Sequence, residues 1–297
     1  MKEIVVISGK GGTGKTSITA SFALLGGKNV VVADCDVDAA DMHLLLQPDF
    51  KQAEDFYSGL LAHIDTDNCT NCAVCADVCR FDAIPVIDGQ HTINEISCEG
   101  CSYCARVCPE KAIRMEERNV GQWFVSTTKI GSTLVHARLG IGAENSGKLV
   151  AKVKNEAKVI AEKNKAELVL VDGSPGVGCP VVSSLSGASY VVLVTEPTVS
   201  GLHDLKRVYE LVHKFNISAG CIINKADLNP QMTDEIMDFM AGENIDHLAN
   251  LPYDETFTKA VTQGKTIVEF DENGLRRILE DSWEKVKKES DKQRRGI

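Results

Sequence analysis

The stretch GKGGTGKT at residues 9–16 decides the fold, because it satisfies the phosphate-loop pattern G-x-x-x-x-G-K-[ST]. An apolar segment at residues 4–8 precedes it and predicts a strand, and a helix is expected to follow. In such a loop the glycines let backbone N–H groups turn toward phosphate oxygens, the lysine adds positive charge, and the final hydroxyl can bind magnesium. We therefore predict a nucleotide-phosphate site formed by Gly9, Lys10, Gly11, Gly12, Thr13, Gly14, Lys15, Thr16 and Ser17.

Further apolar segments alternate with helical patterns along the chain. Residues 30–33, 168–171, 190–195 and 220–223 are short and strongly apolar, which predicts buried strands. Residues 146–164 carry apolar side chains at helical spacing behind a serine that can cap the helix start. This alternation predicts an α/β fold with a doubly wound, mostly parallel sheet.

Polar side chains follow three of these predicted strands. Asp36 and Asp38 lie in DCDVDAAD after the second strand, Asp172 closes the third, and Asn224 and Asp227 lie in INKAD after the last. Ligands of open α/β sheets bind beyond the carboxyl ends of the strands. These side chains are therefore expected near the phosphate loop.

Eight of the eleven cysteines fall into two runs with the same spacing, CTNCAVCADVC at residues 69–79 and CEGCSYCARVC at residues 98–108. The repeat continues into VCRFDAI and VCPEKAI. In the bacterial two-cluster ferredoxin pattern, the fourth cysteine of each run binds the other cluster. The predicted ligands are Cys69, Cys72, Cys75 and Cys108 for one [4Fe–4S] cluster, and Cys98, Cys101, Cys104 and Cys79 for the second.

A pair of structural zinc sites is the alternative for these cysteines. The even repeat, a Cys-Pro pair and the lack of histidine in either run favour iron–sulfur clusters. One departure is Arg80, which follows Cys79 where the pattern usually has proline.

The cysteine module interrupts the α/β pattern. It lies between the acidic segment and the strand-like residues 122–126. We therefore predict a small inserted α+β ferredoxin-like domain at residues 61–116, with the nucleotide domain made of residues 1–60 and 117–297. The glycine-rich residues 137–148 predict either a surface loop or a contact to the insertion.

Composition argues against several partners. The net charge is −10 and no concentrated basic patch is present, which disfavours nucleic acid. The N-terminus lacks the features of a signal peptide, and no apolar window is long enough to span a bilayer, so a cytoplasmic protein is expected. The C-terminal helix, from about residue 272, carries a narrow apolar stripe of Leu275, Leu279, Trp283 and Val286, which favours core packing over membrane targeting.

The extra lysine, Lys10, gives the loop the form KGGTGKT. The chain thereby resembles the deviant P-loop ATPases that include MinD, ParA, the Mrp-type iron–sulfur carriers and the nitrogenase iron protein, here with an inserted two-cluster ferredoxin domain. The resemblance implies an ATPase that dimerises on binding ATP, with its own copy or a paralogue. In that family the extra lysine, here Lys10, reaches the partner's nucleotide.

The resemblance also implies roles for single residues. Lys15 contacts the outer phosphates, Asp36 orients the attacking water with Asp38 as the alternative, and Thr16 and Asp172 hold Mg²⁺. Asn224 and Pro252, with Asp227, border the base. Because NKAD also matches the guanine-binding pattern of GTPases, ATP is favoured but GTP stays open.

Cys179 lies seven residues after Asp172. The nitrogenase iron protein carries an interface-cluster cysteine at this interval, so Cys179 is a candidate interfacial metal ligand. No second cysteine lies between residues 120 and 172, which disfavours a complete four-sulfur site. Cys35 and Cys221 lie in or beside predicted strands and are expected to be small buried hydrophobic residues.

Two functions fit these features. One is an ATP-driven dimeric switch that gates electron transfer through its two clusters to an unknown redox or client protein. The alternative is an ATPase that assembles or carries a metal cluster, as the Mrp-type proteins do. The crossed ligand sets favour permanent clusters and hence electron transfer. Spatial positioning, as in MinD or ParA, has no membrane or DNA feature to support it.

Overall fold

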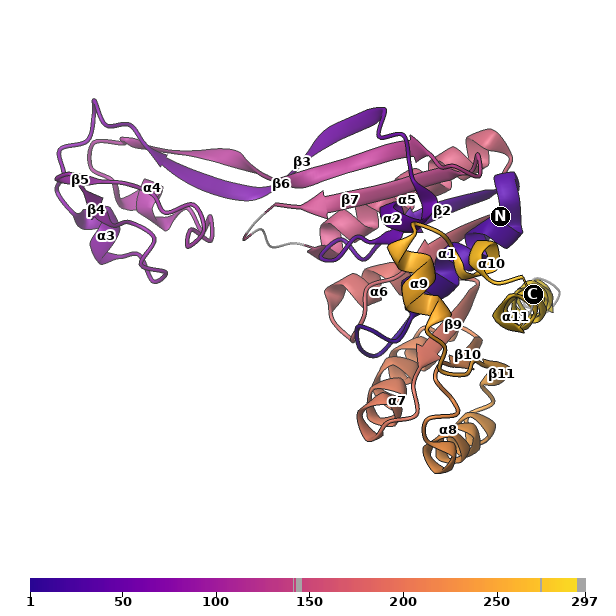
Figure 1. The fold of residues 1–297 in the computed structure, drawn as a ribbon. Helices are drawn as coiled ribbons and strands as arrows, with labels where there is room; N and C mark the ends of the chain where they lie inside the picture. Colours follow the sequence, from indigo (N-terminus) through magenta and orange to yellow (C-terminus); the bar gives the residue numbers. More distant parts are fainter. Residues whose placement is uncertain (141, 143–145, 273, 293–297) are drawn as a thin grey trace. The chain divides into compact units, whose positions relative to one another are not determined.

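The computed structural model describes residues 1–140, 142, 146–272 and 274–292 (Figure 1). Residues 141 and 143–145, within the glycine-rich stretch discussed above, lie outside the described part. The elements in chain order are β1 (Lys2–Ile7), α1 (Lys15–Gly26), η1 (Gly27–Asn29), β2 (Val30–Asp34), α2 (Met42–Leu46), β3 (Gln52–Ile64), α3 (Val74–Asp77), β4 (Val86–Ile87), β5 (Gln90–His91), α4 (Tyr103–Val107), β6 (Ile113–Thr127), β7 (Thr133–Leu139), α5 (Ser146–Asn164), β8 (Leu168–Asp172), α6 (Cys179–Leu185), β9 (Tyr190–Thr195), α7 (Val199–Lys214), β10 (Ala219–Ile223), α8 (Pro230–Gly242), β11 (Asp246–Asn250), α9 (Thr256–Thr262), α10 (Ile267–Phe270) and α11 (Gly274–Lys292).

Within the described residues, the main sheet has nine strands in the order β11-β10-β9-β1-β8-β2-β7-β6-β3. β1 pairs in parallel with β8 and β9, β2 with β7 and β8, and β10 with β9 and β11. β1 lies near the centre of this order, so the loop that leaves its carboxyl end emerges over the middle of the sheet. The predicted α/β fold with a mostly parallel sheet is confirmed.

Both faces of the sheet are covered, as a parallel sheet requires. Ile4 and Val6 belong to one large apolar cluster that also contains Phe22 of α1. Successive strand side chains point to opposite faces, yet Val5 and Ile7 are as fully buried as their neighbours. Helices α5 and α6 pack against each other and against strands of the same sheet, while α1 packs with α10 and α11.

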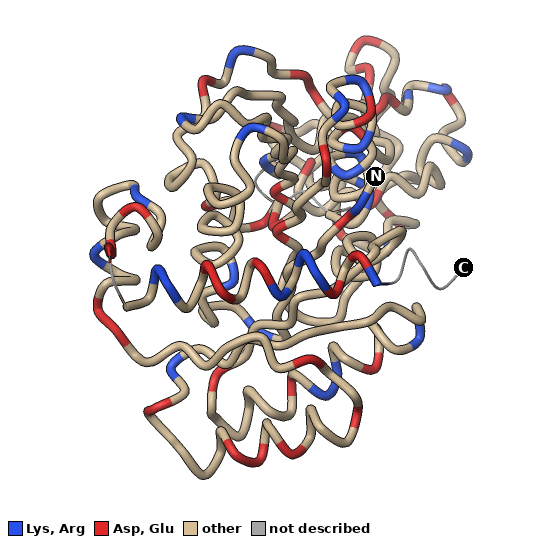
Figure 2. The backbone as a smooth tube through the Cα atoms, turned by 90° about the vertical axis from the view of Figure 1, so that its right-hand side faces the viewer, with Lys and Arg blue, Asp and Glu red and all other residues tan. Residues whose placement is uncertain are grey.

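The C-terminal helix α11 belongs to the core. Its stripe of Leu275, Leu279, Trp283 and Val286 is at most 3% exposed, and the Trp283 ring stacks on Phe22 with centroids 5.0 Å apart. Acidic and basic residues alternate along the length of α11 (Figure 2). The core-packing prediction is confirmed, and within the described residues none of the helices is long and apolar enough to cross a bilayer.

The chain divides into two compact units. The first contains residues 1–54, 123–138 and 146–297, and the second contains residues 55–122 and 139–145. The predicted insertion at residues 61–116 falls within the second unit, and the unit boundaries fall inside β3 and β6. That the second unit is a ferredoxin-like domain stays a prediction.

In the second unit, the backbone conformation repeats along with the sequence. Its small core contains Leu61, Ala83, Ile84 and Ile113 together with cysteine side chains. Three pairs of equivalent positions, two within the cysteine runs and one three residues after each run, share left-handed φ angles: 55° and 63° at Asn71 and Gly100, 65° and 65° at Ala73 and Ser102, and 49° and 53° at Asp82 and Lys111. The two halves therefore fold alike, including where the side chains differ.

Gly100 has a reason to be glycine that Asn71 does not share. A Cβ atom at Gly100 would lie 2.1 Å from the backbone oxygen of Leu60, in addition to its positive φ. Asparagine tolerates left-handed φ without such a neighbour. The backbone of β3 therefore passes close to the second cysteine run.

Candidate functional site

The phosphate loop connects β1 to α1. Gly12 and Gly14 have φ of 79° and 91°, and α1 begins directly after Gly14, at Lys15. Gly9 is equally constrained, because a Cβ there would lie 2.5 Å from Asp204. Residues of the loop line a cavity of about 480 Å³, a volume suited to a small-molecule ligand. The lining residues are Ser8, Gly11, Gly12, Thr13, Gly14, Lys15, Thr16, Ser17, Asp36, Asp38, Ala39, Asp41, Ser174, Pro175 and Pro180.

Lys15 lies in a cage of carboxylates at the base of this cavity. Its Nζ is 2.9 Å from Asp172 Oδ1 and 3.3 Å from Asp36 Oδ2, and the residue is only 5% exposed. Thr16 Oγ1 donates a hydrogen bond of 2.7 Å to Asp172 Oδ2. The structure thus brings together four residues that were predicted from three separate segments.

The charges in this cage shift the pKa values of its members. Burial alone would lower the pKa of Lys15, but the charges of Asp172 and Asp36 outweigh it and raise the pKa. Burial raises the pKa of Asp36, although Lys15 opposes the shift. Asp38, the alternative to Asp36, lines the same cavity but is exposed.

Two further members of the cage were not predicted from the sequence. Asp34, at the end of β2, is 1% exposed, and burial followed by the charge of Asp172 raises its pKa well above the ordinary range. Thr19, one turn into α1, donates a 2.9 Å hydrogen bond to Asp172 Oδ1. The ends of β2 and β8 pair in register at Asp34 and Asp172, a relation that the sequence alone does not give.

A second cavity of about 330 Å³ adjoins the loop on the side of β10. Asn224 is 3% exposed, lines this cavity, and donates a 2.9 Å hydrogen bond from Nδ2 to the Thr13 carbonyl. Asp227 Oδ1 accepts a 2.6 Å hydrogen bond from the backbone N–H of Tyr253. Pro252 is exposed and is not among the described lining residues, whereas Tyr253 and Phe257, which were not predicted, are.

Lys10 is held within its own chain. Its Nζ is 2.6 Å from Glu196 Oε1 and donates to Ser200 Oγ at 3.0 Å and Thr198 Oγ1 at 3.3 Å. Lys225 Nζ contacts the other oxygen of Glu196 at 2.9 Å. Burial would raise the pKa of Glu196, but hydrogen bonds from both lysines outweigh it and lower the pKa. Lys10 is therefore paired at the start of α7 and not at the Lys15 cage.

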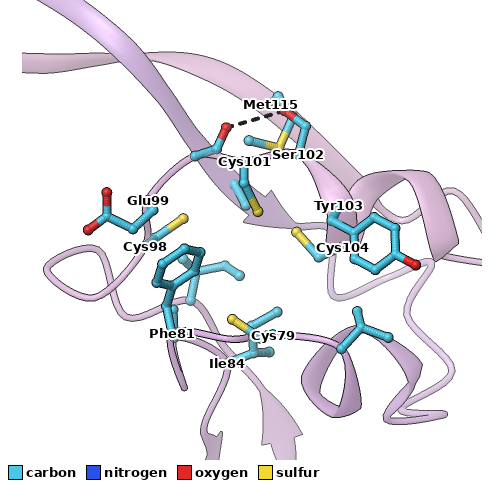
Figure 3. Close-up of a pocket in the computed structure, with 15 residues that line it drawn as sticks. Cys79, Phe81, Ile84, Cys98, Glu99, Cys101, Ser102, Tyr103, Cys104 and Met115 are labelled. Carbon is cyan, nitrogen blue, oxygen red and sulfur yellow. Dashed lines mark hydrogen bonds between the residues drawn. The ribbon is translucent and has the colours of Figure 1, made fainter.

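The eight cysteines of the two runs line two cavities in the second unit. Cys98, Cys101 and Cys104 from the second run share one cavity with Cys79 from the first, as Figure 3 shows. Cys69, Cys72 and Cys75 share the other with Cys108. Each cavity thus takes three sulfurs from one run and the fourth from the other, and much of the remaining lining is apolar.

In neither cavity do the side chains converge on one point. Among the described residues, no group of three or more His, Cys, Asp or Glu side chains surrounds a single-ion position. The sulfurs instead face a shared space, which in Figure 3 lies between Cys79, Cys98, Cys101 and Cys104. That this space holds an iron–sulfur cluster stays a prediction.

The other three cysteines lie apart from these cavities. Cys35 and Cys221 are fully buried, which confirms them as small core residues, and burial raises the pKa of both thiols. Cys179 is exposed at the start of α6. An interfacial metal role for Cys179 stays a prediction.

Comparisons with known proteins agree with this geometry. The profile of the CobQ/CobB/MinD/ParA nucleotide binding domain matches residues 4–267. An uncharacterized protein of Methanocaldococcus jannaschii is 39% identical over 230 residues, covering 76% of this chain and 79% of that protein. A second uncharacterized protein of the same archaeon is 26% identical over 287 residues, covering 95% and 96%.

Solved structures share the fold at low sequence identity. MinD of Pyrococcus horikoshii complexed with Mg-ADP superposes with a TM-score of 0.58 at 20% identity, covering 98% of both chains. The Aquifex aeolicus MinC:MinD complex gives a TM-score of 0.60 at 17% identity, covering 97% of this chain and 96% of that chain. These similarities concern the fold.

Proposed function

The chain belongs to the CobQ/CobB/MinD/ParA family of P-loop ATPases, and from this premise we propose an ATP-driven dimeric switch that gates electron transfer through two [4Fe–4S] clusters. The ATPase activity follows from the family. The electron-transfer function is supported chiefly by one observation, the two cavities that each combine three cysteines of one run with the fourth of the other.

The Lys15 cage fits Mg²⁺ together with a nucleotide phosphate. One lysine faces the carboxyl groups of Asp36 and Asp172, so carboxyl groups outnumber the cation in the cage. Carboxylate and hydroxyl oxygens are the ligands that Mg²⁺ prefers, and Asp172 and Thr16 would hold it. The ion would neutralise phosphate charge as it develops during hydrolysis.

The chain's own residues have distinct tasks in this site. Backbone N–H groups of the loop would bind phosphate oxygens, and Lys15, once it turns from the carboxylates, would offset the charge of the outer phosphates. That turn would leave the Asp36 carboxylate free to accept a hydrogen bond from the attacking water and so to orient it. The exposed Asp38 lacks the burial that would fix such a geometry.

The base side of the site supports ATP over GTP. In the GTP alternative, the aspartate of NKAD would bind guanine. Here one oxygen of Asp227 accepts the backbone N–H of Tyr253 and so helps to hold the loop after β11. Asn224, Tyr253 and Phe257 are left to border the base, with Pro252 beside them in sequence.

The cysteine cavities fit iron–sulfur clusters by the chemistry of their donors. Each supplies four thiols, which as thiolates are the usual ligands of [4Fe–4S] clusters, within a partly apolar lining. When bound, such clusters supply one-electron transfer. Because each set ties the two runs together, release of a cluster would open both halves, which supports permanent clusters. The carrier alternative is favoured by a different observation, the exposed thiol of Cys179.

Replacing Lys10 by alanine is expected to spare folding but to lower ATP-dependent dimerisation and turnover by about tenfold or more. The Lys10 side chain is 28% exposed, and ion pairs near the surface contribute only about 0–1 kcal/mol to stability. In a closed dimer this lysine would leave Glu196 for the partner's nucleotide. Sedimentation with and without a non-hydrolysable ATP analogue, together with ATPase assays, measures both effects.

Lys51→Ala is the matched control for Lys10→Ala, because Lys51 also pairs with a carboxylate but its side chain is 78% exposed. The control should behave as wild type. A Lys10→Ala chain that dimerises and turns over normally would show that Lys10 has no role across a dimer interface.

Metal analysis and redox titration test the proposed function. Anaerobically purified protein is expected to contain about eight irons and eight sulfides per chain.

A non-hydrolysable ATP analogue is expected to shift the potential of at least one cluster by about 59 mV, a tenfold change for a one-electron couple, because the insertion follows Asp36 and Asp38 in the chain. About two zinc ions per chain without visible absorbance would rule out the clusters. Potentials that agree within about 10 mV would favour the carrier alternative.

A further inference from the structure

The cavity of Cys69, Cys72, Cys75 and Cys108 contains a residue that the cysteine pattern does not predict. His91 lines this cavity together with the four sulfurs. It lies in β5, which pairs with β4 in a short antiparallel hairpin between the two cysteine runs. The described lining of the other cavity has no imidazole, and Phe81, Tyr103 and Met115 are among the residues found there (Figure 3).

His91 is buried without hydrogen-bond partners for its ring. The residue is 9% exposed, and both ring nitrogens, Nδ1 and Nε2, are shielded from solvent and lack a partner among the described residues. Buried polar groups in folded proteins are nearly always hydrogen-bonded, since an unpaired one costs stability. A buried imidazole that lines a cavity and bonds to no described group therefore indicates a partner inside that cavity.

Backbone hydrogen bonds hold the segment that carries His91 in this place. The N–H of His91 donates to Asn71 Oδ1 at 3.3 Å, and Asn71 is one of the left-handed residues of the first cysteine run. The N–H of Thr92 donates to the Pro85 carbonyl at 3.0 Å, and that of Asn94 to the Ala83 carbonyl at 2.8 Å. The hairpin is thus tied to the loop that carries Cys69 and Cys72.

We propose that the His91 ring N–H donates a hydrogen bond to a sulfur of the cluster held by Cys69, Cys72, Cys75 and Cys108. A neutral imidazole has one N–H donor. The lining also includes Thr70 and Glu110, but the His91 ring bonds to no described group, so sulfur of the bound cluster is the acceptor that the filled cavity would add. The hydrogen bond stabilises the reduced cluster, which carries one more negative charge, and so raises its reduction potential. This inference rests on the proposed function and makes the two clusters unequal.

Replacing His91 by leucine tests the role of the N–H. Of the two reduction steps, one is expected to become about tenfold less favourable, which is about 59 mV for a one-electron couple, while the other stays unchanged. His91→Gln keeps an N–H donor and should shift that step less. His63→Leu is the control, because His63 belongs to the same unit but is partly exposed and is not among the described lining residues of either cavity.

Redox titration followed by electron paramagnetic resonance measures both steps in the anaerobic, iron-loaded full chain. Pulsed measurements on protein labelled with ¹⁵N-histidine should show imidazole nitrogen coupled to one cluster in the wild type and no such coupling in His91→Leu. The role of His91 would be overturned if His91→Leu at full iron content kept both potentials unchanged and the wild type showed no nitrogen coupling. If the leucine variant does not fold, His91→Gln replaces it in this test. Wild-type protein without iron would instead overturn the proposed function.

Discussion

Replacing Lys15 by alanine is expected to lower ATP turnover by about 10³-fold while the iron content stays unchanged. Lys15 lies at the base of the phosphate cavity, 5% exposed, with its Nζ against Asp36 and Asp172. Loss of one preorganised group that stabilises developing charge typically costs about 10²–10³ in rate. Without this cation the two carboxylates would also repel the incoming phosphates. Single-turnover hydrolysis and metal analysis of the same preparation measure both quantities.

The same variant is expected to show a new pH dependence of stability. Burial raises the pKa of Asp36, and Lys15 now opposes that rise, so removing Lys15 should raise the pKa further. A carboxyl whose folded pKa lies above its unfolded value of about 4 destabilises the fold as it ionises. The free energy of unfolding of Lys15→Ala, relative to wild type, should therefore be highest at low pH and fall as the pH rises through the pKa of folded Asp36.

Lys287→Ala is the matched control for Lys15→Ala, since Lys287 pairs with Glu284 on the surface of α11. It should match the wild type in turnover, iron content and pH dependence. Hydrolysis by Lys15→Ala at more than about a tenth of the wild-type rate would place the phosphates elsewhere than in this loop.

Replacing Cys108 by serine is expected to remove one of the two clusters, lowering the iron content from about eight to about four per chain. Cys108 ends the second run, yet it lines the cavity of Cys69, Cys72 and Cys75. Cys108→Ser should therefore leave the same residual spectrum as Cys69→Ser, although the two cysteines lie in different runs. Cys79→Ser should leave the complementary spectrum, which it shares with Cys98→Ser.

Iron analysis and electron paramagnetic resonance of the four variants identify which cluster survives. Cys179→Ser is the control and should keep about eight irons, because Cys179 lines neither cavity among the described residues. If Cys108→Ser and Cys98→Ser left the same cluster, each run would hold its own cluster and the crossed assignment would be wrong.

The sequence predicted the parts of the fold whose signals are local. The segment at residues 190–195 is apolar up to its last residue, Thr195, as expected for a strand buried on both faces, and its predicted bounds match β9. β3 and β6 were not predicted as long strands, because both carry mainly exposed or charged residues over much of their length. Their pairing depends on neighbouring strands and not on a pattern within each segment.

The residues of the candidate site also fall into those with a local sequence signal and those without one. Lys15, Thr16 and Asp172 could be predicted, since each lies in a motif or at the end of an apolar strand. Glu196 and His91 could not be predicted, because neither belongs to a motif. The role of each depends on residues that are distant in the chain. Glu196 matters because it meets Lys10 and Lys225, which only the sheet order brings together.

The matched left-handed residues of the two repeated halves bear on the history of this module. If one ancestral segment was duplicated, the two copies have since come to differ at all three matched positions, with Asn against Gly, Ala against Ser, and Asp against Lys. Five of these six residues are not glycine, although positive φ costs an ordinary residue roughly 1–2 kcal/mol. The side chains differ at all three positions, while the φ angles of the two copies agree within 8°. Beyond their cysteines, the two copies share a backbone conformation.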